Sequence, residues 1–253
     1  MIVNTINRII ELAGIQQIER GKDIFTLRGL KRLKSPDEQE PEVLELRTLC
    51  GMVDYVQKRI DGRVHAPTEN ALVRSFIHIM SPTTVVLESE LQPTNDNERW
   101  GLASSNLVYN QFQFGQYYRL EDFIVGLRSL FVPTEEVDGL LNMLGHVALE
   151  RIKTLEDNGF AQQINIRIGI RLSQDVEIKS PIILQPYRTF IEVPQPASLF
   201  VLRCREEKAH GAEDKYKMSC ALFEADGGAW KVEAIENIKK YFAEKLPTMR
   251  VIG

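Results

Sequence analysis

The sequence has few cysteines, and their number and spacing argue against two common ways of stabilising a fold. There are only three, Cys50, Cys204 and Cys220. An odd number leaves one unpaired in any disulfide scheme, and the spacing matches no zinc-binding motif. A chain of 253 residues buries enough surface to fold without a disulfide or a structural metal. We therefore expect three reduced cysteines that pack as small core residues in a cytoplasmic protein.

Long apolar runs and a strong excess of positive charge are missing as well. No stretch approaches the roughly eighteen apolar residues of a membrane-spanning helix. The first residues, MIVNTINRIIELAG, lack the basic start and cleavage site of a signal peptide, so we expect none. The net charge of -4 argues against a general nucleic-acid binder. The composition, 43% hydrophobic and 26% charged, is that of an ordinary globular protein, and we expect no membrane partner.

Short catalytic signatures are also absent. The sequence contains neither of the glycine-rich phosphate-binding motifs, no HExxH or CxxC motif, and no GxSxG nucleophile elbow. The four histidines stand far apart, and a histidine inside an apolar pattern is more often a packed residue than a ligand; they are His65, His78, His146 and His210. We therefore expect no cofactor and favour a non-enzymatic protein, although many enzymes carry no short signature.

One stretch of the sequence has the clear alternating pattern of a β-strand. Residues 164–172 read INIRIGIRL, with isoleucine or leucine at every second position, and the same period continues through Val176 and Ile178. Successive side chains of a strand point to opposite faces, so this pattern predicts a strand with one buried face in a mostly antiparallel sheet. We expect Ile164, Ile166, Ile168 and Ile170 to be buried and Asn165, Arg167 and Arg171 to be exposed.

Further patterns predict the other strands and several helices. Alternation and turn residues predict strands around Ile18 and Ile24–Leu27, and over 72–80, 84–91, 100–107, 176–179, 182–184, 199–205 and 216–224. Residues 109–118 fit either an edge strand or a packed loop. The prolines of 186–198 exclude a central strand there. Apolar residues at helical spacing predict helices over 2–10, 46–60, 120–131, 137–155 and 230–242.

These elements predict an α+β fold: a mostly antiparallel sheet with helices packed on one side and a central helical hairpin formed by 120–131 and 137–155. We expect one domain over 1–253, which divides, if at all, into subdomains 1–118 and 119–253. Residues 35–42, SPDEQEPE, predict an exposed loop or linker.

A basic cluster precedes that loop, formed by Arg28, Lys31, Arg32 and Lys34. Such residues could neutralise phosphates of DNA or RNA. A solvated face, partly neutralised by the acidic residues that follow, is the simpler interpretation and the one we favour.

A second cluster carries the chemistry of a metal-dependent nuclease. Glu177 and Lys179 lie two residues apart on one face of a strand, with Asp175 just before them. Carboxylates in such a site hold Mg²⁺ while the lysine stabilises charge, and Glu88 and Glu90 could add ligands. Alternating charges are also the ordinary pattern of an exposed strand face, and we favour that interpretation.

Two further segments carry a resemblance. PYRTFIEVPQPAS (Pro186–Ser198) and FEADGGAW (Phe223–Trp230), together with the predicted helix Leu46–Ile60, resemble a loosely defined family of uncharacterised phage- and prophage-encoded proteins. The resemblance covers mainly the C-terminal half and implies no catalytic residues. It implies an accessory protein in the cytoplasm of a bacterial host. We expect such a protein to act by binding another macromolecule, first of all protein. The first alternative is a DNA- or RNA-binding accessory protein of phage replication or recombination, and the second is the Mg²⁺-dependent nuclease described above. The apolar N-terminal helix and residues 109–118 also favour a homo-oligomer.

Overall fold

The computed structural model describes the backbone over most of the chain and side chains over part of it. The described backbone comprises residues 17–20, 23–26, 31–32, 42–58, 74–91, 98–108, 110–149, 151–157, 162–168, 172–178, 180–208 and 216–253. Side chains are described for residues 42–58, 74–91, 98–108, 110–145, 180–205 and 218–253. The predicted helix 2–10 and loop 35–42 lie outside the described residues.

The protein has an α+β fold, as the sequence predicts. The described residues contain four helices, which are α2 (Leu49–Lys58), α4 (Leu120–Leu130), α5 (Glu135–Leu149) and α6 (Trp230–Lys245). The strands are β1 (Gln17–Arg20), β2 (Asp23–Thr26), β3 (Lys31–Arg32), β4 (Leu44–Leu46), β5 (Ser75–Ser81), β6 (Thr84–Ser89), β7 (Gly101–Asn106), β8 (Tyr118–Arg119), β9 (Arg151–Asp157), β10 (Gln162–Ile168), β11 (Leu172–Ile178), β12 (Ile182–Leu184), β13 (Ser198–Lys208), β14 (Tyr216–Glu224) and β15 (Arg250–Ile252).

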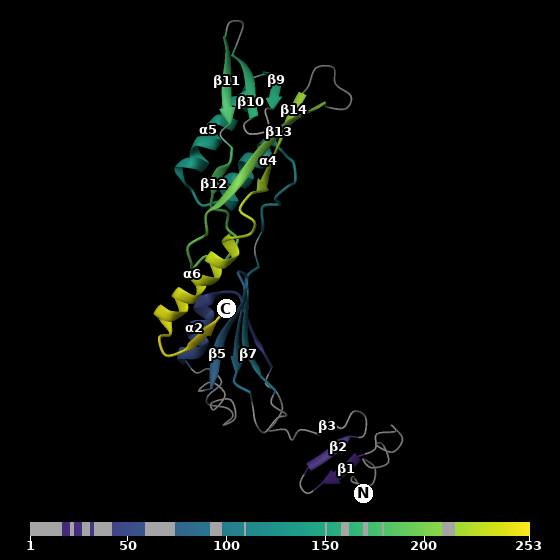
Figure 1. The fold of residues 1–253 in the computed structure, drawn as a ribbon, viewed down its shortest axis with the longest axis vertical. Coiled ribbons are helices and arrows are strands. Elements are labelled where there is room, and N and C mark those ends of the chain that lie inside the picture. Colours follow the sequence, from purple (N-terminus) through teal and green to yellow (C-terminus); the bar gives the residue numbers. More distant parts are fainter. Residues whose placement is uncertain are drawn as a thin grey trace.

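Two mostly antiparallel sheets form the body of the molecule, one beyond the other along its long axis (Figure 1). The five-stranded sheet has the order β15-β5-β6-β7-β4, and only its two short edge strands pair in parallel. The four-stranded sheet has the order β12-β13-β14-β8 and is antiparallel throughout. Two smaller antiparallel sheets are formed by β1–β3 and by β9–β11. The strands predicted at 72–80, 84–91, 100–107, 182–184, 199–205 and 216–224 are confirmed.

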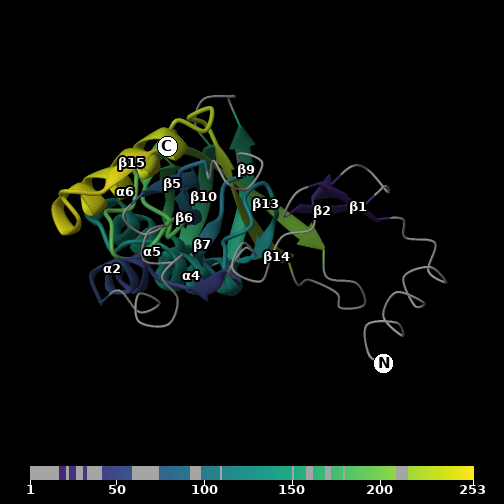
Figure 2. The ribbon, with the colours of Figure 1, turned by 90° about the horizontal axis from the view of Figure 1, so that it is seen from below.

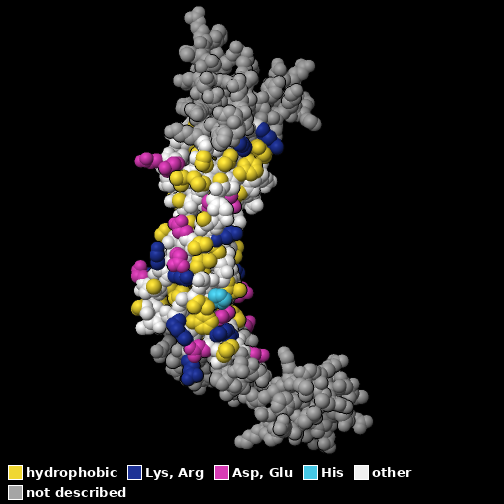
Figure 3. Space-filling view, in the orientation of Figure 1, with side chains coloured by type: hydrophobic (Ala, Val, Ile, Leu, Met, Phe, Trp, Pro, Cys, Tyr) yellow, Lys and Arg dark blue, Asp and Glu magenta, His cyan; other side chains and the backbone are white. Residues whose placement is uncertain are grey.

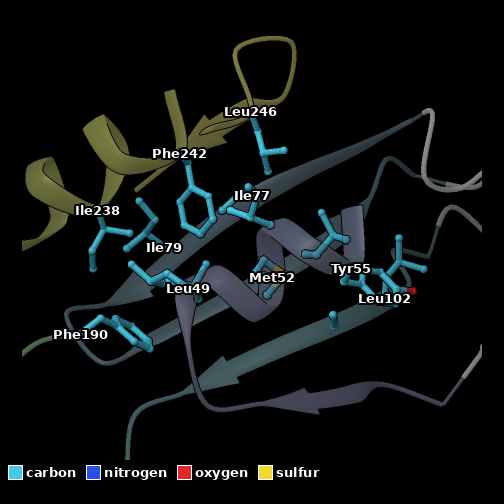
Figure 4. Packing of buried hydrophobic residues seen from close by; sticks show 14 of the residues in the cluster. Leu49, Met52, Tyr55, Ile77, Ile79, Leu102, Phe190, Ile238, Phe242 and Leu246 are labelled. Carbon is cyan, nitrogen blue, oxygen red and sulfur yellow. The ribbon is translucent and has the colours of Figure 1, made fainter. Parts of the chain in front are cut away.

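The five-stranded sheet buries one face under two helices. Strands β5 and β6 alternate in exposure, with Ile77, Ile79, Val85 and Leu87 completely or almost completely buried. These side chains form one core with α2 and α6, which lie on the same side of β5–β7 (Figures 2 and 4). Alternation thus makes one face of the sheet apolar, and the helices cover that face.

A second core lies beneath the four-stranded sheet. Phe200, Leu202 and Cys204 of β13 and Cys220 and Leu222 of β14 point to one face, where α4 and α5 pack. Helix α5 begins as predicted, because the Val137 N–H donates to Thr134 Oγ1 at 3.3 Å. The helices are consecutive, but their arrangement as a hairpin stays a prediction.

Residues 186–198, named here the bridging segment, join the two cores. The segment follows β12 in the four-stranded sheet, yet Phe190 is completely buried in the core of the five-stranded sheet. Thr189 Oγ1 donates to the Pro82 carbonyl at 2.6 Å. Glu192 Oε1 accepts the Leu49 N–H at 2.8 Å and so caps α2. The expected absence of a central strand here is confirmed, and the segment is instead a buried connection.

Two predicted boundaries in the middle of the chain are wrong. The helix expected over 137–155 ends at Leu149, and Arg151–Asp157 form β9, which pairs with β10. Pairing with a neighbouring strand overrides the helical spacing of Leu155. The strand expected over 164–172 ends at Ile168, and β11 returns antiparallel beside β10. Both strands of a hairpin show the same alternation of apolar and polar residues, so the pattern does not indicate where the chain turns back. The side chains of β10 and β11 lie outside the described residues, so the predicted burial of the isoleucines and exposure of the polar residues stay predictions.

Smaller corrections concern single positions. Leu46 belongs to β4 rather than to the helix that follows, which begins at Leu49. Cys50 is exposed, because its position on α2 points away from the core, whereas Cys204 and Cys220 are buried as expected. In the run 109–118 the described residues form a loop that ends in β8, with Phe112 buried. Among the described helices, none has the length and apolar character needed to span a membrane.

Candidate functional site

The face of the five-stranded sheet opposite α2 and α6 is the principal candidate site, and we name it the open face. Register places Arg250, Phe76 and Glu88 in one cross-strand row. The next row contains Ile252, His78, Val86 and Ser104. On β5 and β6 these residues alternate with buried residues, so their side chains point away from the helices. The row members on β15 and β7 are cross-strand partners of these residues, so their side chains lie on the same face.

Apolar surface lies at the centre of the open face. Ile252 is 49% exposed, and Met80, at the bulge that ends β5, is 59% exposed. Phe76 and Val86 are half-buried. Figure 3 shows a histidine at the surface of the body, with hydrophobic, acidic and basic side chains near it. This composition resembles the centre of a protein–protein interface more than an ordinary solvated sheet surface.

Charged groups of both signs border that apolar centre. The His78 Nδ1 lies 3.5 Å from Glu88 Oε2, in a pair that is about one-third exposed on the histidine side. Arg250 forms an ion pair with Glu90. The Arg99 guanidinium lies over the Phe76 ring at 5.1 Å from its centroid. A border of paired charges around apolar residues fits a protein surface of mixed charge.

The outer face of the four-stranded sheet, named here the arginine face, is a second surface. Arg205, Ser219 and Arg119 occupy one cross-strand row, and Arg203 lies in the next. The Arg205 guanidinium lies 3.9 Å from the Tyr117 ring centroid. Tyr117 in turn meets the partly exposed Phe223 edge to face at 6.3 Å. Arginines interleaved with aromatic rings can hold phosphates and stack on bases.

A third cluster, around Arg188, is buried and holds the two cores together. Arg188 Nη1 donates to Glu224 Oε1 at 2.5 Å, and Nη2 donates to the Ser198 hydroxyl. Its guanidinium lies 4.0 Å from the ring centroid of Trp230, the first residue of α6. The Arg188 side chain is only 5% exposed, so it offers no surface to a ligand. The cluster is structural.

Asp226 belongs to the same cluster. Burial by itself raises its pKa, but hydrogen bonds from the Ser198 hydroxyl and the Gly228 N–H, together with Arg188, outweigh burial and lower the pKa below the ordinary value of 3.8. The carboxylate therefore stabilises the fold at neutral pH. That contribution is lost as the pH falls through the lowered pKa.

A groove of about 530 Å³ lies where α4 meets α5. Leu127, Phe131, Val137 and Leu141 provide its apolar wall, and Arg128, Asp138 and Asn142 lie at its polar side. No histidine or cysteine lines it, and the one carboxylate has no second carboxylate beside it. The groove therefore lacks the paired acid and base, or the nucleophile and base, that a catalytic site needs.

The structure places the two further carboxylates considered for the predicted nuclease site in a different sheet from Asp175 and Glu177. Asp175 and Glu177 lie on β11, in the sheet formed by β9–β11. Glu88 lies on β6 of the five-stranded sheet, and Glu90 directly follows that strand. Glu88 and Glu90 face His78 and Arg250 instead. The side chains of Asp175 and Glu177, and Lys179 altogether, lie outside the described residues, so this site stays a hypothesis. Among the side chains that the structure describes, no three histidine, cysteine or acidic residues lie together as a metal site would require.

Two residues of the predicted basic cluster, Lys31 and Arg32, form β3. The side chains of these two residues lie outside the described residues, as do Arg28 and Lys34 altogether. Sequence reasoning missed the open face, the arginine face and Arg188. The alternation of 72–80 and 84–91 predicts two faces on each strand, but it does not reveal which face the helices leave uncovered.

Comparison of the chain with protein-family models, with curated proteins and with solved structures gives no match.

Proposed function

We propose that this chain is a non-enzymatic accessory protein that acts by binding protein, and that the open face is its binding surface. The observation that supports the proposal is the uncovered apolar centre formed by Phe76, Met80, Val86 and Ile252. The phage-type origin and the cytoplasm of a bacterial host, which the resemblance implies, are part of the same proposal.

The charge of the open face favours protein over nucleic acid as the partner. Glu88 and Glu90 lie beside Arg250, Arg99 and His78, so the face carries both signs. A surface that follows a phosphate backbone needs a basic excess. An apolar centre with a mixed, paired border matches the anatomy of protein interfaces.

A second copy of the chain fits the open face as its first partner. In the row Arg250–Phe76–Glu88, the basic residue lies on the edge strand β15 and the acidic residue on β6. A copy related by a two-fold axis would place the acidic end of one row against the basic end of the other. The apolar residues between them would then cover one another.

This proposal predicts that charge at the centre of the open face abolishes self-association. The variant carrying Met80→Glu and Ile252→Glu should sediment as a monomer of 28.9 kDa at micromolar concentration, while the wild-type chain sediments as a larger species. Both residues are largely exposed, at 59% and 49%, so the fold should change little.

Val125→Glu is the matched control. Val125 is 60% exposed on α4, outside the open face, so this substitution adds one of the two negative charges elsewhere on the surface and should leave the mass unchanged. A wild-type chain that is monomeric throughout this concentration range would contradict self-association, as would an oligomer that survives the double substitution.

We also propose a second candidate function, binding of single-stranded DNA or RNA, because the arginine face combines Arg119, Arg203 and Arg205 with Tyr117 and Phe223. The support is weaker than for the first, since two exposed acidic residues lie close to Arg119 in the first turn of α4; they are Glu121 and Asp122. The predicted basic cluster at 28–34 offers an alternative phosphate contact for the same function.

Nucleic-acid binding predicts a steep salt dependence that rests on this face. Replacing Arg203 and Arg205 with Ala should weaken binding of a fluorescent oligothymidylate and flatten the dependence of its affinity on salt, because fewer counterions are released. Anisotropy titrations measure both effects, and the exposed Arg47→Ala is the matched control. Unchanged binding in the double variant would place the contact elsewhere, with 28–34 as the next region to replace. No binding at about 50 mM salt, where phosphate contacts are strong, would remove this function.

A further inference from the structure

Two cysteines face each other inside the four-stranded sheet. Cys204 of β13 and Cys220 of β14 are directly opposite partners in an antiparallel pair. Their Sγ atoms lie 2.8 Å apart, with no atom between them. Both side chains are buried, Cys220 completely. The third cysteine, Cys50, is exposed on α2 and hydrogen-bonds to Thr48, so it belongs to another part of the molecule.

We propose that Cys204 and Cys220 are a redox-active pair that forms an intrachain disulfide between β13 and β14. Directly opposite residues of antiparallel strands have Cα atoms about 4.5 or 5.5 Å apart. Both separations fall within the roughly 4.4–6.8 Å that disulfides span. The bond can therefore form with little movement of either strand.

The reaction needs an oxidant, and a low-molecular-weight disulfide such as oxidised glutathione supplies it. The thiolate of one cysteine attacks one sulfur of glutathione disulfide and releases one glutathione thiolate. The thiolate of the second cysteine then attacks the cysteine sulfur of this mixed disulfide and releases the other. Two protein thiols and one glutathione disulfide become one protein disulfide and two glutathione thiols.

The native fold controls when this exchange takes place. The hydrogen bond with Cys204, burial and the charge of that neighbour all raise the pKa of the Cys220 thiol. Thiolate is the attacking species, so the buried pair is protected from oxidants while the sheet is closed. Exchange therefore takes place during folding, or when the hairpin β13–β14 opens locally.

Refolding in a glutathione buffer tests the proposal. The variant Cys50→Ser keeps only the facing pair, and it should be unfolded in denaturant and refolded with oxidised and reduced glutathione. We expect its free thiols to fall from two to none, its intact mass to fall by two hydrogen atoms, and a digest to contain a peptide linking residues 204 and 220. The same variant held folded in the same buffer should react much more slowly.

A thermal melt supplies a second readout. The bond closes a short loop in the unfolded chain, so the oxidised variant should melt several degrees above the reduced form. The double variant Cys50→Ser and Cys204→Ser should show no loss of mass and no such shift. Two free thiols after refolding, a stable glutathione adduct, or a link only between chains would each overturn the proposal. These readouts do not depend on the open face, so they are independent of the proposed binding function.

Discussion

Arg188→Met should be among the most destabilising single substitutions in this protein. Methionine fills a similar volume but removes a cation that hydrogen-bonds to Glu224 and Ser198 and lies over Trp230. Breaking a buried pair by removing one partner costs about 3–5 kcal/mol. Glu224 is 39% exposed and regains some hydration, so we expect a loss near the lower end, about 3 kcal/mol in the free energy of unfolding.

Two variants separate charge from geometry in this experiment. Arg188→Lys keeps the charge but loses the fork that reaches two acceptors at once, so it should recover only a small part of the stability. Arg47→Met removes an arginine whose side chain is 61% exposed, and it should change stability by less than about 0.5 kcal/mol. Urea unfolding of the three variants gives the comparison. An Arg188→Met chain as stable as wild type would show that the cluster does not hold the cores together.

Gln195→Met should be comparably destabilising, although it removes no charge. The Gln195 side chain is buried, and its Oε1 accepts the N–H groups of Arg188 and Thr189. Its Nε2 lies within hydrogen-bonding distance of the carbonyls of Thr189, Phe190 and Val193. A group left buried without a partner costs about 1–3 kcal/mol. With two N–H groups unpaired, we expect a loss of about 3 kcal/mol in the free energy of unfolding.

Gln113→Met is the matched control, because Gln113 is exposed in the loop before β8. Its stability should stay within about 0.5 kcal/mol of wild type. Equilibrium unfolding in urea measures both variants, provided that each unfolds in one transition. Equal stability of the two variants would contradict the role of Gln195 as the internal support of the bridging segment.

Much of the fold is predictable from local patterns. The alternation in 72–80 and 84–91, with a turn at Pro82, predicts β5 and β6, and the spacing of Ala234, Ile238 and Phe242 predicts the buried stripe of α6. In these elements the local pattern and the final packing agree. Where they disagree, as at Leu155, the partner strand decides, and a partner distant in the sequence is not visible in a local pattern.

The candidate surfaces depend on long-range contacts and were therefore not predictable. The open face exists because α6, near the C-terminus, covers the same side of β5 and β6 as α2. The facing cysteines depend on the register of β13 and β14, which a single sequence does not fix. Arg188 stands in a proline-rich segment that predicts only the absence of a strand. Nothing local indicates that its guanidinium meets Glu224 from another element.

Hydroxyl-radical footprinting at two protein concentrations tests the proposed binding function of the open face most directly. Met80, 59% exposed in a single chain, reports on this face, and Ile191, 77% exposed on the bridging segment, serves as the internal reference. We expect oxidation of Met80 to slow markedly between nanomolar and tens of micromolar protein, while modification of Ile191 stays constant. A rate at Met80 that is the same at both concentrations would mean that no second copy covers the open face, and would contradict the account.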